Sequence, residues 1–299
     1  MTPATPMAPL NRAAPRCVYR AMEQHLMERM TWTEVDATLT AGVDAVLLPF
    51  GSVEQHGPHM PLDTDCFIAG ALALRAAQRA AQDGLRLLVA PTVNVTLSWY
   101  HMQYPGSMRL RTQTFLSVFR DVCDSLFEHG IRTVVIVNGH GGNVAALTVA
   151  INDYLAATGR RITVANWLEL AADVVGELTT PATHAEEAET SLAMALGQRV
   201  DMDLAVCDAF ERSAAVHDAG LPWTSLGRYD AHHRGPSAIV PMDMLRDISP
   251  SGVVGDARRA TVETGERILE VVVPRLVQLT RELSQTAPHP DQEVTTTWK

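Results

Sequence analysis

The stretch from Leu47 to Asp65, LLPFGSVEQHGPHMPLDTD, decides the architecture of this 299-residue chain. It begins inside an apolar run, residues 43–50, which is typical of a strand buried on both faces of a sheet. The run breaks at Gly51, and four potential metal ligands follow. These are Glu54, His56, His59 and Asp65.

The residue types in this loop indicate a metal site. Carboxylates and imidazoles without a nearby thiolate suit borderline or hard divalent ions such as Zn, Mn or Fe. Glu54 and His56 are two residues apart, so an extended segment projects both side chains to the same side. A glycine and two prolines after them predict a turn that brings Asp65 back towards the same point. The alternative is a polar surface turn that contains histidines by chance.

Composition predicts a soluble globular protein and argues against several other classes. A hydrophobic content of 46% and a charged content of 19% are typical of a globular chain with a sizeable core. The net charge of −10, with no cluster of Lys or Arg, argues against a nucleic-acid or membrane partner. The four cysteines form neither a disulfide framework nor a zinc ribbon. Because no apolar segment is long enough for a membrane span or a signal peptide, we expect a cytoplasmic location.

Strand-like and helix-like segments alternate along the chain. The expected strands are 44–50, 85–90, 133–137 and 162–165, and the expected helices are about 21–30, 31–39, 66–82, 112–129, 144–158, 183–196 and 256–283. This rhythm predicts a single-domain, three-layer α/β/α fold with a central, mainly parallel sheet. We expect the domain at residues 21–283. It follows an N-terminal arm, residues 1–20, that is disordered or draped over a partner, and precedes a polar tail, residues 284–299.

A second loop places a histidine at the end of a strand. Residues 133–137 run directly into NGHGGN, residues 138–143, which lacks the spacing of a phosphate-binding loop. Because loops at the carboxyl ends of parallel strands meet at one edge of the sheet, we expect His140 beside Glu54 and His56. The alternatives are a helix-start turn with an incidental histidine and a Ser/His/Asp triad. The triad lacks the G-x-S-x-G elbow that it would need.

A later helix begins with THAEEAETS, residues 183–191. His184, Glu187 and Ser191 share one face of this helix. The three carboxylates in its first turns lie where the helix dipole favours negative charge. By itself, this pattern favours an ordinary acidic helix start with a solvated face.

Two other regions carry candidate substrate contacts. The connection 92–111 is long for a compact domain, and such loops are often functional, although loop packing accounts for its side chains equally well. Its candidates are Trp99, Tyr100 and His101. The irregular region 200–254 supplies candidates for the mouth of a site, from the same or a neighbouring subunit. These are Asp230, His232 and His233.

Five motifs together resemble the creatininase (creatinine amidohydrolase) family. They are GSVEQHGPHMPLDTD (51–65), YPGSMRL (104–110), NGHGGN (138–143), HAEEAETS (184–191) and GVVGDARRAT (252–261). They occur in the order of the family over roughly residues 31–270. The resemblance implies an α/β fold, a two-metal hydrolytic site and, commonly, a hexameric assembly.

The resemblance also implies a set of ligands. Glu54 and His140 would bind one metal, His56 would bind the other, and Asp65 would bridge the two. In creatininase itself, a glutamate two residues after the equivalent of His140 binds the second metal, but this chain has Gly142 there.

The missing carboxylate is expected from the helix that starts after His184. Glu187 is the expected replacement ligand and a catalytic candidate, and Glu189 is the fallback. Glu186 replaces a glycine that is usual in the family. His184 aligns with a histidine thought to move protons in the family.

These residues predict a metal-dependent hydrolase of a small amide, either a cyclic amide or a formamide. A hydroxide bridging two divalent ions, with Zn expected first and Mn or Fe as alternatives, would attack the carbonyl. His184 would then pass a proton to the leaving nitrogen. The family also includes enzymes of sugar-like cyclic ketones and a peptidase that trims a cofactor precursor, and both remain alternatives. The glycine at 142 argues against creatinine itself as the substrate.

Overall fold

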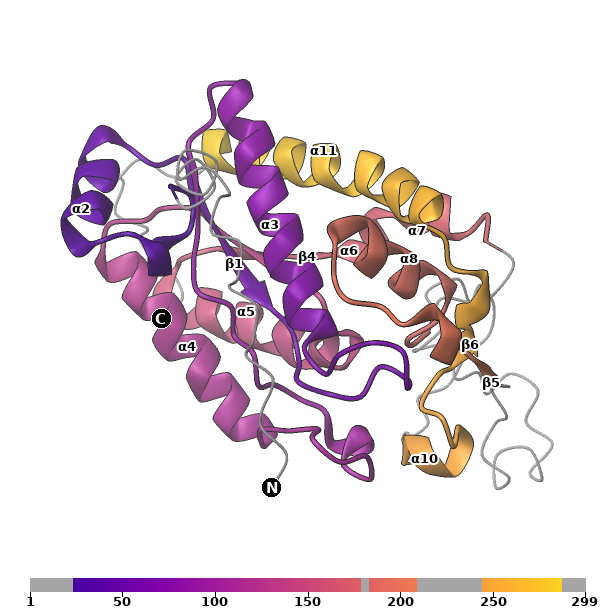
Figure 1. Cartoon of the computed structure of the whole chain (residues 1–299). Coiled ribbons are helices and arrows are strands. Elements are labelled where there is room, and N and C mark those ends of the chain that lie inside the picture. The colour runs from indigo at the N-terminus through magenta and orange to yellow at the C-terminus, as the bar shows by residue number, and fades with distance from the viewer. Residues whose placement is uncertain (1–23, 179–182, 209–243, 287–299) are drawn as a thin grey trace, which may run out of the picture.

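A four-stranded parallel sheet forms the centre of the protein (Figure 1). The computed structural model describes residues 24–178, 183–208 and 244–286. The strands are β1 (Ala45–Phe50), β2 (Leu87–Val89), β3 (Val134–Asn138) and β4 (Ile162–Asn166), in the order β2-β1-β3-β4. Phe50 pairs with Asn138, so β1 and β3 end at the same level of the sheet. The two loops that carry the expected ligands therefore leave from one edge.

Helices cover both faces of the sheet, which confirms the expected three-layer architecture. On one face lie α3 (Thr64–Gln82), α8 (Glu187–Leu196) and α11 (Val262–Thr286), and on the other lie α4 (Thr112–Glu128) and α5 (Val144–Thr158). Neighbouring residues of β1 point to opposite faces. Leu47 packs in the core with α3, whereas Leu48 packs in the core with α4. Every residue of β1 is buried for this reason.

Shorter elements complete the described part of the chain. The helical ones are η1 (Met27–Arg29), α2 (Trp32–Ala41), η2 (Trp99–His101), η3 (Gly141–Asn143), α6 (Trp167–Leu170), α7 (Ala172–Val175), η4 (Met202–Leu204), α10 (Leu245–Ile248) and η5 (Ala257–Arg259). The strands β5 (Cys207–Asp208) and β6 (Gly255–Asp256) form an antiparallel pair. The expected start of α2 is confirmed, because Thr31 and Glu34 form a reciprocal capping box. Within the described residues, no helix is both long enough and apolar enough to cross a membrane.

Three expected helices differ from the structure. The helix expected over residues 183–196 begins only at Glu187, and His184 pairs with Val254 in a β-bridge, so the prediction that His184 shares a helical face with Glu187 and Ser191 is wrong. In the described part of the helix expected over residues 21–30, only the three-residue 3-10 helix η1 forms, because the carbonyl of His25 accepts a hydrogen bond from the amide of Val89. This segment therefore follows the edge of the sheet at β2. The last helix begins at Val262 instead of 256, because residues 255–256 pair with β5. The expected N-terminal arm and the residues after 286 lie outside the described ranges.

Candidate metal centre

Four of the expected ligands meet at the carboxyl edge of the sheet. Glu54 and His56 lie in the loop after β1, Asp65 lies in the first turn of α3, and His140 follows β3. Their exposed fractions are between 0% and 4%, so the cluster is shielded from solvent. A glycine permits this close approach, because a Cβ atom on Gly139 would lie 2.3 Å from the carbonyl oxygen of Asp65.

His140 faces two carboxylates with a nitrogen that is free to bind a metal. Its Nδ1 atom lies 3.2 Å from Oε1 of Glu54 and 3.0 Å from Oδ2 of Asp65. Both of these oxygens are buried, and within the described structure neither accepts a hydrogen bond. The Nε2–H group of His140 donates to the carbonyl of Leu97 at 2.9 Å, so Nδ1 faces the carboxylates and offers a lone pair once its proton is lost. A ring fixed in this way by a carbonyl is typical of a metal-binding histidine.

His56 forms the second half of the cluster in the same way. Its Nδ1–H group donates to the carbonyl of Glu54 at 3.0 Å, so Nε2 is the nitrogen that offers a lone pair once the ring is neutral. That atom lies 3.1 Å from Oδ1 of Asp65 and 3.6 Å from Oε1 of Glu189. Asp65 thus faces His140 with one oxygen and His56 with the other, an arrangement that suits a carboxylate shared by two cations. The donors are oxygen and nitrogen atoms, which fit a divalent metal of the Zn or Mn type.

The charges in the cluster influence each other strongly. Burial lowers the pKa of His56 and of His140, but the adjacent carboxylates outweigh burial and raise both pKa values well above the usual range. Burial raises the pKa of Asp65, but the two imidazoles hold this pKa well below its usual range. Burial also raises the pKa of Glu189, and His56 lowers it overall. Without a metal the cluster therefore holds protons on its histidines, which a cation has to displace.

The two glutamates of helix α8 are placed differently. Glu189 lines a cavity beside the cluster, and its Oε2 atom accepts a hydrogen bond from the amide of Ala185 at 2.6 Å. Glu187 does not line that cavity, and it belongs to none of the described groups of side chains with metal-ligand spacing. Positions two apart on a helix point in nearly opposite directions, so both cannot face His56. The structure therefore places the fallback residue, and not the first-choice ligand, beside the cluster.

The packing around Gly142 explains why no carboxylate comes from that position. A Cβ atom there would lie 2.4 Å from Nε2 of His140, 2.7 Å from the hydroxyl of Tyr100 and 2.8 Å from the carbonyl oxygen of Leu97. Contacts this short do not occur for real Cβ atoms. Any further carboxylate has to reach the cluster from another element, and Glu189 does so from α8.

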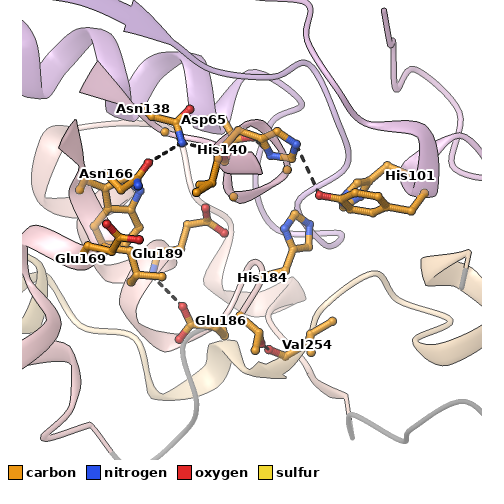
Figure 2. A pocket seen from close by; sticks show the side chains of 18 of the residues that line it. Asp65, His101, Asn138, His140, Asn166, Glu169, His184, Glu186, Glu189 and Val254 are labelled. Carbon is orange, nitrogen blue, oxygen red and sulfur yellow. Dashed lines mark hydrogen bonds and ion pairs between the residues drawn. The ribbon is translucent and has the colours of Figure 1, made fainter. Parts of the chain in front are cut away.

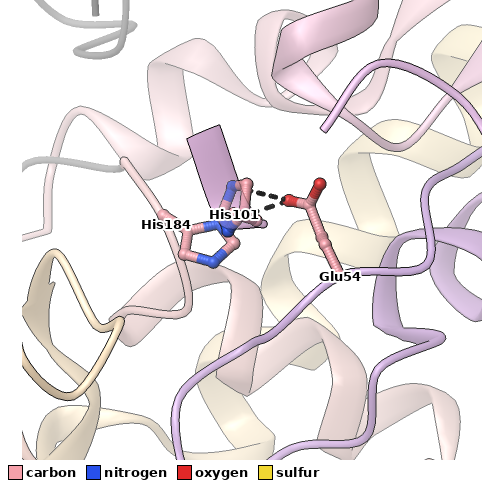
Figure 3. Close-up of side chains that lie close together, drawn as sticks. All are labelled: Glu54, His101 and His184. Carbon is pink, nitrogen blue, oxygen red and sulfur yellow. Dashed lines mark ion pairs between the residues drawn. The ribbon is translucent and has the colours of Figure 1, made fainter. Parts of the chain in front are cut away.

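Two more histidines border the cluster (Figure 3). Nε2 of His101 lies 3.1 Å from Oε1 of Glu54, and Nδ1 of His184 lies 3.9 Å from the same oxygen. Burial lowers the pKa of His101, and the charges of His184 and His140 lower it further. Burial and the charge of His56 lower the pKa of His184 despite the nearby carboxylates. Both rings are therefore neutral at neutral pH.

A cavity of about 200 Å³ opens beside these side chains (Figure 2). His184 and Glu189 point into it, and Glu186 lies at its far wall. Of the candidate substrate contacts, Tyr100 and His101 line the cavity. Trp99 does not line it. This side chain is 46% exposed and packs edge-on against the ring of Tyr100.

The remaining candidates lie elsewhere. His59 is buried, but its Nε2 atom contacts the hydroxyl of Thr190 at 2.9 Å, and it belongs to none of the described metal-like groups. Burial lowers the pKa of His59 to about 4. The candidates Asp230, His232 and His233 fall outside the described residues.

Sequence reasoning missed two polar residues that support the cluster. The hydroxyl of Ser98 donates to Oε2 of Glu54, and the amide of Gln55 contacts both His101 and His184. The position of Gln55 between two expected ligands was a usable indication. Simple alternation along an extended segment predicts instead that Gln55 points away from them.

The fold and the cluster together define a class: a parallel α/β enzyme with a buried carboxylate–imidazole centre at the carboxyl edge of its sheet. Comparison with known proteins gives the family. The family model described as creatinine amidohydrolase matches residues 28–280. The chain belongs to the creatininase family of metal-dependent amidohydrolases, as its motifs predict.

Known relatives agree with this assignment. The mycofactocin precursor peptide peptidase of Mycobacterium tuberculosis is 31% identical over 84% of this chain and 89% of its own length. The creatinine amidohydrolase of Pseudomonas putida is 28% identical over 85% of this chain and 95% of its own. A Bacteroides fragilis protein, provisionally assigned as a creatinine amidohydrolase, superposes with a TM-score of 0.74 at 26% identity, over 91% of this chain and 99% of its own.

Other relatives show the range of chemistry in the family. The 3-dehydro-scyllo-inosose hydrolase of Thermotoga maritima is 26% identical over 82% of this chain and 79% of its own. A deformylase of a formylamino-pyrimidine monophosphate from Methanobrevibacter ruminantium is 29% identical over 50% of this chain and 58% of its own. Among the solved structures, one creatininase is described with Mn and a creatininase variant is described as a Zn-Zn type.

Proposed function

We propose that this enzyme hydrolyses the C–N bond of a small amide, a cyclic amide or a formamide, on two divalent cations. Glu54 and His140 would hold one cation, His56 and Glu189 would hold the other, and Asp65 would bridge them. One observation carries this proposal. Two buried carboxylate oxygens, on Glu54 and Asp65, lie 3.0–3.2 Å from Nδ1 of His140, the ring nitrogen that no backbone carbonyl holds, and neither oxygen has a hydrogen bond within the described structure.

The metal pair would supply a polarised carbonyl and a water molecule whose pKa is lowered towards neutrality. The chain's own residues would then move protons and hold the substrate. Neutral His184 has a nitrogen 3.9 Å from Glu54, in a position to accept a proton from water and to pass it to the leaving nitrogen. Tyr100 and His101 line the cavity, where they would contact the substrate.

Zinc is the first expectation for the metal. The cluster of His56, His140, Glu54, Asp65 and Glu189 offers two imidazoles and three carboxylates with no thiolate among them, a set that Zn, Mn and Fe all accept. The relatives described with Zn and with Mn support the same short list. Relative affinity alone does not decide which metal a protein holds in a cell.

The names of the relatives favour amide chemistry. The creatinine amidohydrolase, the peptidase and the deformylase are all named for cleavage of a C–N bond. The peptidase alternative has specific support, because its identity of 31% exceeds the 28% of the creatinine amidohydrolase. Hydrolysis or isomerisation of a sugar-like cyclic ketone is the other alternative, and it would use the same metal pair.

Metal analysis tests the proposal most directly. Protein purified without chelator should hold about two equivalents per chain, and His140→Ala should lose metal. His129 is exposed, so His129→Ala is a matched control that should keep both equivalents. Absence of metal after dialysis against Zn and Mn would refute the proposal.

A substrate panel then separates the alternatives. The Zn-loaded or Mn-loaded enzyme would be assayed on formamides, cyclic amides, short peptides and cyclic ketones. Turnover of a small amide supports the proposal. Turnover of peptides alone or of ketones alone assigns one of the alternatives.

We also propose a homohexamer that works in the cytoplasm on a small-molecule substrate, as the family resemblance implies. Light scattering coupled to size-exclusion chromatography measures the mass of the assembly directly. A monomeric mass would refute the hexamer without affecting the proposed chemistry.

A further inference from the structure

Gln55 lies between Glu54 and His56 in the sequence, and only 5% of its surface is exposed. Its side-chain amide has four polar neighbours. The Oε1 atom lies 2.9 Å from the amide nitrogen of Gly57. The Nε2 atom lies 3.1 Å from the carbonyl oxygen of Gly252, 3.0 Å from Nδ1 of His101 and 2.9 Å from Nε2 of His184. This one side chain therefore connects its own loop, after β1, to the three segments that carry His101, His184 and Gly252.

Two backbone groups fix the orientation of this amide. The N–H group of Gly57 can only donate, so the oxygen of the amide must face it. The carbonyl of Gly252 can only accept, so the NH₂ group must face that side. The fit is close, because a Cβ atom on Gly252 would lie 1.9 Å from Oε1 of Gln55. The orientation thus follows without any assumption about the histidines.

Counting hydrogens then decides the state of each ring. The Nε2 atom of His184 lies 2.8 Å from the main-chain carbonyl of Gln55, which can only accept. This nitrogen therefore carries the hydrogen and cannot accept one from the side-chain amide. The two amide hydrogens go to the carbonyl of Gly252 and to Nδ1 of His101. Because Nδ1 of His101 accepts one of these hydrogens, the ring's own hydrogen is on Nε2.

The two rings therefore present opposite groups to Glu54. In its neutral form His184 has a lone pair on Nδ1, 3.9 Å from Oε1 of Glu54, and His101 has a hydrogen on Nε2, 3.1 Å from the same oxygen but without the geometry of a hydrogen bond to it. His56 and His140 resemble His184, because each has its other nitrogen bonded to a backbone carbonyl. His101 differs because its other nitrogen meets an amide donor.

We propose that Gln55 is a positioning residue that fixes the tautomers of His101 and His184. With its carbonyl it makes His184 a proton acceptor, and with its side chain it makes His101 a hydrogen-bond donor. This inference rests on the proposed function in so far as the cavity is the active site. A lone pair suits the general base, and His101, which lines the cavity, offers a hydrogen on Nε2 beside Glu54.

The same tautomer excludes His101 as a metal ligand. The ligand atoms of Glu54, His101 and His184 lie as close together as those of a metal site. A nitrogen that carries hydrogen has no lone pair for a cation. The metals are therefore confined to the side of the cluster where Asp65 lies.

The test reads the ring nitrogens directly. Protein labelled with ¹⁵N in histidine and loaded with zinc is measured by long-range ¹H–¹⁵N correlation NMR, and the His101 signals are assigned by their loss in His101→Asn. In the wild type, both His101 and His184 should carry hydrogen on Nε2. A hydrogen on Nδ1 of wild-type His101 would overturn the proposal.

The variant Gln55→Glu sharpens the test, because a carboxylate has no hydrogen to give. His101 should then carry a hydrogen on Nδ1, whereas His184, held by the main chain, should be unchanged. If His101 kept its lone pair on Nδ1 in this variant, Gln55 would not be what positions it. Gln55→Met, with neither donor nor acceptor, should leave His101 exchanging between tautomers, and a single fixed tautomer there would also contradict the proposal.

These measurements need no substrate, so they are separate from the test of activity. If the panel of amides showed no turnover, the tautomers would still be read. If Gln55→Glu did not fold, the wild type and Gln55→Met would give the answer.

Discussion

The Nε2 atom of His56, in the loop after β1, lies 3.6 Å from Oε1 of Glu189, in the first turn of helix α8. This contact joins two halves of the chain that are far apart in sequence. Through this contact, α8 supplies His56 with a second carboxylate besides that of Asp65. The loop after β3 cannot supply one, because Gly142 has no side chain. Helix α8 is held in place by close packing on α11, since a Cβ atom on Gly265 would lie 2.0 Å from the carbonyl oxygen of Ser191.

The contact predicts which glutamate binds metal. Glu189→Gln should lose about one metal equivalent per chain, because an amide is a much weaker ligand than a carboxylate. Glu187→Gln is the matched control on the same helical turn and should keep both equivalents. Elemental analysis of the two purified variants measures this. Loss of metal from Glu187→Gln alone would return the ligand to the position first expected from sequence.

The packing around Gly142 predicts that this position does not tolerate a side chain. Gly142→Ala should displace His140, reduce the bound metal and destabilise the protein by about 1–3 kcal/mol, the usual cost of overpacking. Gly141→Ala is the control, because a Cβ atom there meets nothing within 4 Å. Metal analysis and urea unfolding of both variants test this. A Gly142→Ala protein with full metal content and unchanged stability would contradict the packing argument.

Sequence predicted the edge of the sheet where the cluster lies but not the choice of its last carboxylate. The strand–loop pattern placed Glu54, His56 and His140 at one edge because parallel strands end together, and residue spacing alone carries that information. The choice between Glu187 and Glu189 depends on how helix α8 is rotated about its axis. Contacts between α8 and α11 set that rotation, and local sequence does not reveal them.

Tertiary pairing also explains what local patterns missed. Residues 24–30 have helical spacing, yet His25 bonds to Val89 at the edge of the sheet. Gln55 turns towards His101 because the loop after Glu54 is not a regular strand. In both cases, long-range partners override the local preference.

Metal affinity should depend on pH with a predictable sign. The carboxylates raise the pKa values of His56 and His140 in the metal-free protein, so both imidazoles hold protons at neutral pH. A cation needs the neutral rings, so zinc binding should release protons. The affinity for zinc should therefore fall as the pH is lowered, by about tenfold per pH unit for each proton released. Chelator competition over a pH series and calorimetry in buffers of different ionisation enthalpy measure both effects. Zinc binding with no proton release would contradict the raised pKa values.

The raised histidine pKa values affect the stability of the metal-free fold with the opposite dependence on pH. A histidine whose pKa is raised in the folded state stabilises the fold below its unfolded value, near 6.5, and that stabilisation is lost as pH rises through the raised pKa. Metal-free protein should therefore be less stable at high pH, where zinc binds best. Thermal melts with and without zinc across the pH series should diverge as the pH increases.

Glu186 gives a stability prediction that is independent of the histidines. Burial raises its pKa from 4.5 to about 8, despite the hydrogen bonds that it accepts from the amides of Ala188 and Glu189. The folded, metal-free protein therefore holds this proton more tightly than the unfolded chain, and its stability should fall as pH rises between those two values. Glu186→Gln cannot ionise, so this loss should disappear.

At low pH the variant should be slightly less stable than the wild type, because glutamine has one oxygen to accept the two amide hydrogen bonds. Above about pH 8 it should melt on the order of 5 °C higher relative to the wild type than it does at low pH. Thermal melts in chelator over this pH range measure the difference, with exposed Glu169→Gln as the control that should show none. A constant difference between Glu186→Gln and wild type at every pH would mean that Glu186 is ionised throughout.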